Sequence, residues 1–460
     1  MAETQTGALP KQTHIQPLKQ RIEQGRALRE RLPRDRHATW KMPASRRDPV
    51  DILIEQGCAR MSDLLPLRYT RMKVSPFAFL RGGAAIMAAD LAASPATGLV
   101  VQAGGDCHCL NFGGFATAER RLAFDINDFD ETAVAPWEWD LKRLATSFVV
   151  AAFDRLGKDA RAELAAITAG SYRKTMAEVA GTPVLDAWYK ALTIDDENTA
   201  EAIGIDMRAL KEADRRLKHA IELHPMRHRP GPSPRIEDAP PLVYHPKPAR
   251  AASFRNGVEA MLAHYRASLI PERRTLLDRY RLVDAAYKVV GVGSVGTRCG
   301  IMLMVSGDGE ALYLQFKEAM ASVLEPHASA SPYVHHGERV VRGQRLLQAA
   351  SDILLGFATG PTGRQMYVRQ LRDAKIKPQL ETMGHRNFRR YAATCGEVLA
   401  RAHARSADAV VLSAYLGKGT AFDEAIAAFA TAYGKQTEQD YEALQKAIKT
   451  GRLPIADKDS

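Results

Sequence analysis

The sequence predicts an α+β fold with two lobes, a small antiparallel sheet lobe and a larger lobe made mainly of helices. Apolar residues recur at helical spacing over most of residues 49–224 and again from residue 385 onward. Between these stretches, residues 287–319 contain three short apolar runs joined by Gly-containing turns, which is typical of an antiparallel sheet. The length of 460 residues suits one large two-lobed unit or two to three domains.

The composition is that of a globular protein. Hydrophobic residues make up 46% of the chain and charged residues 25%, which excludes a mainly disordered or collagen-like chain. Five cysteines are too few for a disulfide scaffold and suit a reducing compartment. The first residues lack the apolar core of a secretory signal, and no run of 18 apolar residues occurs. We therefore expect a cytoplasmic protein without a membrane span.

The net charge of +11 is concentrated in two segments. Residues 1–50 hold 11 Lys and Arg against 5 Asp and Glu, and residues 206–250 hold 10 against 6. A dedicated nucleic-acid binder more often carries its positive charge on a folded face. Nucleic acid is therefore not an expected partner, and a non-enzymatic binder that uses the basic N-terminal arm is kept only as a minor alternative.

The chain divides into five segments at shifts in composition. Eight prolines fall within residues 225–250, a density that no regular element tolerates. The predicted segments are, in order, a basic N-terminal arm (1–48), a helical lobe with two polar loops (49–224), a Pro-rich basic loop or linker (225–250), a sheet lobe with a Gly-rich hairpin (251–380) and C-terminal helices that complete the helical lobe (381–460).

Local patterns predict the elements that border the polar segments. Residues 76–93 and 138–156 carry apolar side chains at helical spacing, and each is expected to form one helix. Residues 98–104 form a continuous apolar run that is typical of a buried strand. A further helical pattern covers residues 252–282 and leads into the first strand of the sheet lobe, which is expected at residues 287–293.

The densest cluster of polar residues is GDCHCLNFG (105–113) followed by FDINDFDET (124–132). Asp106 and Asn111 come directly after the apolar strand, and Asp128 follows Asn111 by 17 residues. Three oxygen-bearing side chains at two adjacent strand ends predict a site for a hard cation such as Mg²⁺. A carboxylate beside the cation could orient or deprotonate a hydroxyl.

Turn formation alone would explain any one of these polar residues. The carboxylates of Asp125, Asp128, Asp130 and Glu131, however, would repel one another unless a cation or a basic group offset their charge. The set as a whole therefore favours a functional site.

The run Cys107-His108-Cys109 does not predict a zinc site. Alternating residues of an extended strand point to opposite faces, so His108 cannot share a side with both thiols. No second Cys and His cluster occurs at zinc-like spacing, and a packed histidine between two buried thiols is expected instead.

A second constellation lies in residues 287–319. Gly291, Gly293 and Gly296 form a G-x-G-x-x-G pattern, which is followed by the strand pattern IMLMV and not by a helix. The glycines, with Ser294 between them, are therefore expected in the loop of a strand–loop–strand hairpin, the arrangement that protein kinases use to cover nucleotide phosphates. A Gly-rich hairpin without any ligand is the alternative.

The third strand of this constellation carries Lys317. A lysine in this position pairs with the inner phosphates of a nucleotide and is usually steered by a glutamate on a helix. The next helical pattern, residues 337–351, offers Glu338, and Glu325 lies in the loop before it. Glu338 is preferred because a helix gives its side chain a fixed direction.

Phosphoryl transfer needs what the two constellations supply together. Its catalysis consists mostly of positioning and charge neutralisation by a base, metal ligands, a phosphate cover and a cation. In ordinary kinases the glycine loop precedes the catalytic loop, whereas here Asp106 comes about 185 residues before Gly291. A circular permutation would produce the same site from this reversed order.

The motifs GDCHCLNFG, FDINDFDET and PWEWDLKRLA resemble the signatures of an uncharacterised bacterial family, domain of unknown function 2252, and the resemblance extends over most of the chain. That family is commonly grouped with the protein-kinase-like and aminoglycoside-phosphotransferase superfamily. The resemblance implies a circularly permuted, two-lobed protein-kinase-like fold that uses ATP and Mg²⁺.

The resemblance also implies roles for individual residues. Asp106 resembles the catalytic-loop aspartate that accepts or orients the proton of the acceptor, and Asn111 resembles the metal-binding asparagine. Asp128, with Asp130 in the same D-F-D segment, resembles the metal-binding aspartate. Asp140, twelve residues after Asp128, would anchor the catalytic loop.

Three basic residues and one further segment have simpler expected roles. Arg81 and Arg298 could contact phosphate, but Arg81 is more readily explained as a partner of the carboxylate cluster. His403 is expected to be a hydrogen-bonded helix residue. Residues 366–374 are our prediction for the segment that contacts the nucleobase.

The sequence therefore predicts an ATP- and Mg²⁺-dependent transferase of phosphoryl or nucleotidyl groups. Gly105 precedes Asp106, as in small-molecule kinases, which favours a small-molecule acceptor of unknown identity. The alternative is a nucleotide-binding pseudokinase that acts as a regulatory or scaffold module.

Overall fold

The structure is a computed structural model. It describes residues 15–194, 197–203, 205, 208, 210–211, 228–229, 234–240, 242–289, 291, 295–360, 362–371 and 376–456. Among these residues, none of the helices combines the length and the apolar character that crossing a membrane requires.

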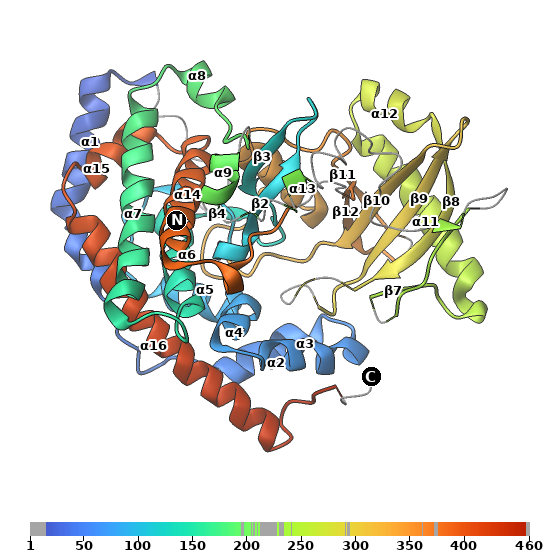
Figure 1. Cartoon of the computed structure of the whole chain (residues 1–460), viewed down its shortest axis with the longest axis horizontal. Coiled ribbons are helices and arrows are strands. Elements are labelled where there is room, and N and C mark those ends of the chain that lie inside the picture. The colour runs from blue at the N-terminus through green and yellow to red at the C-terminus, as the bar shows by residue number, and fades with distance from the viewer. Residues whose placement is uncertain are drawn as a thin grey trace, which may run out of the picture.

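The protein has an α+β fold in which one antiparallel sheet lies at one end and most helices lie at the other (Figure 1). The sheet has six strands in the order β11-β12-β10-β9-β8-β7, and every neighbouring pair is antiparallel. Its strands are β7 (Val243–Tyr244), β8 (Tyr280–Lys288), β9 (Cys299–Ser306), β10 (Ala311–Glu318), β11 (Gly356–Thr359) and β12 (Gln365–Gln370).

Alternating side chains of β9 divide between the two faces of this sheet. Met302 and Met304 pack under α11 (Pro248–Ser268) and α12 (Pro271–Leu277), whereas Ile301 and Leu303 belong to a smaller cluster on the opposite face. The period of two is that of an ordinary pleated strand with both faces covered.

The helical end is built around α6 (Trp137–Ala151), which is buried along nearly its whole length. A large apolar cluster joins this helix to its neighbours. The other long helices of this end are α1 (Leu18–Arg31), α7 (Lys158–Ala180), α14 (His385–Ala404) and α16 (Ala421–Lys449). The shorter helices are α2 (Pro49–Cys58), α3 (Leu65–Met72), α4 (Pro76–Gly82), α5 (Ala84–Ala92), α8 (Val184–Tyr189), α9 (Glu197–Ala202), α13 (His336–Leu347) and α15 (Ala409–Leu416).

Two small antiparallel strand pairs lie between the helices and the large sheet and carry the polar loops. The first pair is β1 (Val100–Ala103) with β4 (Ala133–Pro136), and the second is β2 (Phe112–Ala116) with β3 (Leu122–Ile126). Residues 104–111 connect the first pair to the second, and residues 127–132 lead back. The topology therefore brings the two polar loops to the same side.

Three predicted elements end at different residues in the structure. The expected helix at 76–93 is two helices, because the Gly82-Gly83 pair ends α4, and a Cβ on Gly82 would collide with Met72. The expected helix at 252–282 ends at Ser268, and α12 starts afresh at Pro271, whose ring cannot continue a helix. The strand expected at residues 287–293 is β8, which begins at Tyr280 and ends at Lys288, and the short β7 precedes it in the same sheet.

Residues 15–48, which the sequence analysis treats as part of an arm, pack on the helical end. Arg21 forms an ion pair with Asp408 at 2.7 Å, and a Cβ on Gly25 would collide with the backbone of α15. Arg46 joins Asp90 to Asp440.

The described part of the Pro-rich segment contains three two-residue strands. These are β5 (His228–Arg229), β6 (Arg235–Ile236) and β7, which adds to the edge of the large sheet beside β8. The expectation that no regular element occurs there is therefore wrong for these residues.

Candidate functional site

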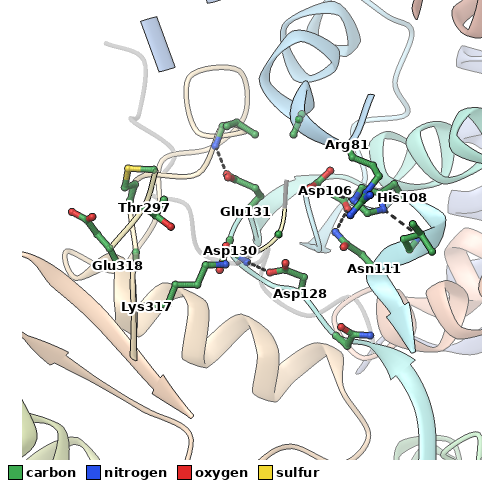
Figure 2. Close-up of a pocket in the computed structure, with 18 of the residues that line it drawn as sticks. Arg81, Asp106, His108, Asn111, Asp128, Asp130, Glu131, Thr297, Lys317 and Glu318 are labelled. Atoms are coloured by element: carbon green, nitrogen blue, oxygen red, sulfur yellow. Dashed lines mark hydrogen bonds and ion pairs between the residues drawn. The ribbon is translucent and has the colours of Figure 1, made fainter. Parts of the chain in front are cut away.

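A cavity of about 400 Å³ lies between the polar loops and the large sheet (Figure 2). It is lined by the predicted site residues Asp106, Asn111, Asp128, Asp130, Gly291 and Lys317. Gly293 and Ser294 lie outside the described residues. Gly296 and Glu338 are described but are not among the lining residues.

Asp140 holds the loop that carries Asp106. Its carboxylate accepts hydrogen bonds from the backbone N–H of Gly104 at 2.6 Å and of Gly105 at 2.9 Å, as predicted for an anchor. His403 on α14 lies 3.1 Å from the same carboxylate and is fully buried, which confirms its expected packing role. Gly105 has a φ of +82° and leaves no space for a Cβ against the Glu131 carbonyl, so the two polar loops touch at this glycine.

Asp106 faces the cavity and pairs with Arg143 of α6. The Nε of Arg143 donates to Oδ1 of Asp106 at 2.8 Å. Burial nevertheless raises the pKa of Asp106 to about 7, although the guanidinium of Arg143 lowers it, and the charges of Asp128 and Glu131 raise it further. A carboxylate with a pKa near 7 is suited to general-base chemistry at neutral pH.

Asn111 ties the two polar loops together. Its side-chain Nδ2 donates to the backbone carbonyl of Asp106 at 2.7 Å, and its backbone carbonyl accepts from the backbone N–H of Asn127 at 2.9 Å. Because the amide nitrogen is engaged by the loop, the oxygen of the Asn111 side chain is the atom that could bind a cation.

Asp128 and Asp130 differ in their surroundings. Asp128 is half-buried, and its Oδ1 lies 3.4 Å from the backbone nitrogen of Asp130. Asp130 forms an ion pair with Lys317 and accepts a hydrogen bond of 2.8 Å from the hydroxyl of Tyr367 on β12. Burial opposes the charge of Asp130, but Lys317 and Tyr367 outweigh it and hold its pKa below the usual value.

Lys317 of β10 reaches across the cavity to Asp130 (Figure 2). Burial disfavours its charge, but the attraction of Asp130 outweighs burial and raises the pKa of Lys317. Glu338, the predicted partner of Lys317, lies on α13 and pairs with Arg342 at 3.2 Å.

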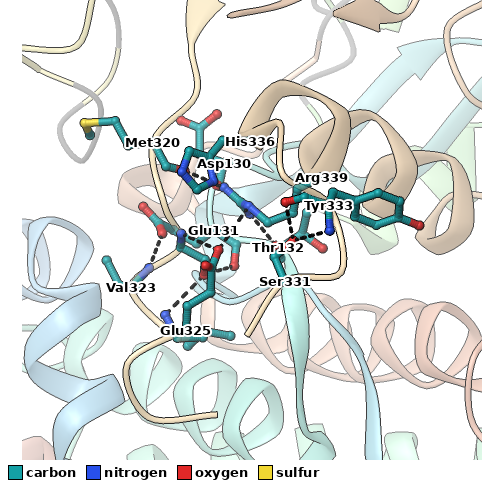
Figure 3. A network of polar contacts seen from close by, with 12 residues as sticks. Asp130, Glu131, Thr132, Met320, Val323, Glu325, Ser331, Tyr333, His336 and Arg339 are labelled. Atoms are coloured by element: carbon teal, nitrogen blue, oxygen red, sulfur yellow. Dashed lines mark hydrogen bonds and ion pairs between the residues drawn. The ribbon is translucent and has the colours of Figure 1, made fainter. Parts of the chain in front are cut away.

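Arg339, the residue after Glu338, is a site residue that sequence reasoning missed (Figure 3). It is buried, its Nη2 donates to the carbonyls of Asp130 and Met320 at 2.8 Å, and its Nη1 donates to the carbonyl of Thr132. Its Nε lies 3.4 Å from Glu325, the second glutamate considered for Lys317. Helix α13 therefore fixes the polar loop 127–132, but it does so through Arg339 and not through Glu338. Arg339 binds backbone carbonyls, which no sequence pattern marks.

The glycine hairpin is confirmed as a strand–loop–strand unit between β8 and β9. Gly291 and Gly296 have φ angles of +63° and +92°, which non-glycine residues rarely adopt. The loop is held by the segment that follows α2, because Met61 N–H donates to the carbonyl of Gly296 at 2.8 Å and Arg60 donates to the carbonyl of Val295 at 2.7 Å.

Cations line the sheet side of the cavity in addition to Lys317. Lys288 and Arg369 belong to the lining, and neither was singled out from the sequence. Arg298 forms an ion pair of 3.3 Å with Glu318, the residue that follows Lys317, and therefore has a structural partner. Charged residues are common on strands, so the sequence does not mark Arg369 as a site residue. It reaches the sheet side of the cavity because β12 lies beside β10 in the sheet.

The donor set fits a cation that brings some of its own ligands. Among the described residues, no three His, Cys, Asp or Glu side chains form a group that could hold a metal ion. Asp128 and Asn111 nevertheless offer one carboxylate and one amide oxygen at the cavity wall, and Mg²⁺ usually takes one or two protein ligands with phosphate and water completing its shell.

The run 107–109 is a packed segment, as expected. Cys107 and Cys109 are buried free thiols. His108 is also buried, its ring nitrogen Nδ1 accepts from the backbone N–H of Leu110 at 3.2 Å, and one edge of the ring reaches the cavity wall.

The comparison with protein families matched most of the chain. The model of DUF2252, described as an uncharacterized protein conserved in bacteria, matches residues 60–447. Searches of curated proteins and of solved structures each returned no match.

Proposed function

The chain belongs to the DUF2252 family, and we propose that it is an ATP- and Mg²⁺-dependent transferase with a circularly permuted, two-lobed protein-kinase-like fold. The transferred group is phosphoryl or nucleotidyl, and the acceptor is a small molecule. One observation carries this proposal: Lys317 and Asp130, which are 187 residues apart, pair across a single cavity that Asp106, Asn111 and Asp128 also line.

Two residues of the polar loops 104–111 and 127–132 would hold Mg²⁺. The Asp128 carboxylate and the Asn111 side-chain oxygen are the hard donors that this ion prefers, and nucleotide phosphates would complete the shell. The ion would offset the charge that gathers on the transferring phosphate.

The sheet wall would bind the nucleotide. Lys317 would exchange its contact with Asp130 for the inner phosphates, while Gly291 lets the loop backbone approach them without a Cβ in the way. Leu371, within the predicted nucleobase segment, and Lys377, three residues after it, line the same cavity, which favours that end of β12 for the base.

Asp106 would accept the proton from the acceptor. Its pKa of about 7 keeps a useful fraction of the carboxylate ionised at neutral pH, and its loop is fixed by Asp140. The contact with Arg143 orients this carboxylate toward the cavity.

One observation favours the alternative of a nucleotide-binding pseudokinase. Both Nε and Nη2 of Arg143 donate to the same oxygen of Asp106, and a carboxylate engaged in this way is a weaker base. Under this alternative the cavity binds ATP tightly without turning it over.

The test uses ATP labelled separately in the α and γ phosphates, with Mg²⁺ and a broad pool of small-molecule acceptors. We expect transfer of one label, and its loss in Asp106→Ala and Asp128→Asn, while Asp278→Asn, which breaks only an exposed ion pair with Arg266, keeps the wild-type rate. Tight ATP binding without transfer would support the pseudokinase. Absence of both binding and transfer would refute both functions.

A further inference from the structure

Arg81 is a cation at the cavity that the proposed nucleotide site does not use. It stands in the last turn of α4, lines the cavity, and lies beside Asp106 and His108 (Figure 2). Lys317, the cation proposed for the nucleotide, and the lining residue Arg369 come from the large sheet on the other side of the cavity.

The guanidinium of Arg81 has no acidic partner among the residues that the structure describes. Its Nε is buried and donates no hydrogen bond, and its Cζ lies 6.0 Å from the centre of the Phe77 ring. The expectation that Arg81 pairs with the carboxylate cluster is therefore wrong, and the nearby Asp106 pairs with Arg143 instead. A buried donor without an acceptor costs free energy, which an anion from solution would recover.

The position of Arg81 relative to Asp106 is fixed by Arg143. The Nη2 of Arg143 donates to the carbonyl of Leu80 at 2.8 Å, directly before Arg81, while the same guanidinium pairs with Asp106. Ser75 caps the other end of α4 by accepting from Ala78 N–H at 3.1 Å. The short helix α4 thus holds the guanidinium of Arg81 in a fixed position next to Asp106, the candidate base.

We infer that the acceptor is an anion, a small molecule whose carboxylate or phosphate group binds Arg81 while its nucleophilic hydroxyl faces Asp106. This inference rests on the proposed function. A guanidinium binds a carboxylate or a phosphate with two parallel hydrogen bonds, which fixes orientation as well as place. A cationic acceptor would meet Arg81 and Arg143 at this end, with Asp106 already paired. A neutral acceptor could accept a hydrogen bond from Arg81 but would not offset its charge.

The test titrates inorganic phosphate, as a probe for the anionic group, onto the full chain saturated with Mg²⁺ and a non-hydrolysable ATP analogue, by calorimetry. With the nucleotide site filled, we expect phosphate to bind, and Arg81→Gln to weaken that binding roughly 10- to 100-fold, as for loss of a charge-assisted contact. Arg81→Lys should retain part of the affinity, and Arg279→Gln, which removes an exposed arginine outside the cavity lining, should bind like wild type.

The outcomes separate this inference from the proposed function. Failure of phosphate to bind the saturated wild-type chain, or equal binding by Arg81→Gln, would overturn the anionic acceptor. A tenfold loss of analogue affinity in Arg81→Gln would instead make Arg81 a nucleotide contact and also overturn it. If the analogue itself does not bind wild type, the proposed function fails, and titration of phosphate onto the nucleotide-free chain still decides whether Arg81 binds an anion.

Discussion

Replacing Lys317 by Met would leave Asp130 as a carboxylate without its cation, in a position where the surrounding protein disfavours charge. The side chain of Lys317 is 4% exposed and that of Asp130 is 23% exposed. Breaking a buried ion pair by removing one partner typically costs about 3–5 kcal/mol. Since a quarter of Asp130 faces cavity water and Tyr367 still donates to it, we expect a loss near the lower end, about 3 kcal/mol.

The pH dependence of this loss has a definite sign. In the wild type the pKa of Asp130 is depressed, so its contribution to stability is present above its unfolded pKa and disappears as the pH falls through the folded value. In Lys317→Met the largest opposing influence is gone, so burial pushes that pKa upward against the weaker effects of Tyr367 and Arg369. The variant should therefore differ most from wild type at pH 8, and the difference should shrink toward pH 5 as Asp130 takes up a proton.

Urea unfolding followed by circular dichroism at both pH values measures this difference. The double variant Lys317→Met, Asp130→Asn should recover most of the lost stability at pH 8, because the carboxylate charge that Lys317 offset is gone. Lys190→Met is the matched control, since its ion pair with Glu178 is about half exposed on both sides and is expected to contribute under about 1 kcal/mol. A single variant as stable as wild type at pH 8, or a double variant no better than the single one, would refute this reasoning.

Three further outcomes follow from contacts at the site. Asp140→Asn should lose about 2–4 kcal/mol of stability, because the new amide nitrogen would face a backbone N–H. Hydrogen exchange at residues 104–106 should accelerate, and unchanged exchange would contradict the anchoring role of Asp140. Transfer activity should rise with pH through about 7 as Asp106 ionises, and Arg143→Met should move this rise to higher pH, since Arg143 lowers that pKa; a shift to lower pH would be the wrong sign. Gly296→Ala should cost about 1–3 kcal/mol in thermal unfolding because of its φ of +92°, and a neutral effect would show that the loop relaxes freely.

Features that depend on neighbouring residues could be predicted from the sequence. The hairpin with Lys317 on the strand after it was predictable because glycine turns and strand alternation are local patterns. The Asp140 anchor was implied by the family resemblance, in which such an aspartate follows the metal-binding one by about a dozen residues, as Asp140 follows Asp128 here. The same reasoning failed at residues 252–282, where one proline divides a helical pattern and a strand takes its last part.

The partners of the charged residues could not be predicted. Arg339 and Arg60 bind backbone carbonyls, and a carbonyl is present at every position of the chain, so no side chain marks it in advance. Lys317 was expected to pair with a helical glutamate, whereas Asp130, already assigned to the metal, is the carboxylate that faces it. Which of several acids meets a given cation depends on how distant segments pack, and this is decided only in three dimensions.

During translation, Asp130 leaves the ribosome 187 residues before the lysine that neutralises it. At about 5–20 residues per second this is a delay of roughly 10–40 s. Over that period the newly made helices and polar loops lack both Lys317 and Arg339, the two residues that hold residues 130–132 in place. The cavity is thus completed late in synthesis, and a chain released before residue 317 would keep an unneutralised carboxylate where the finished protein has an ion pair.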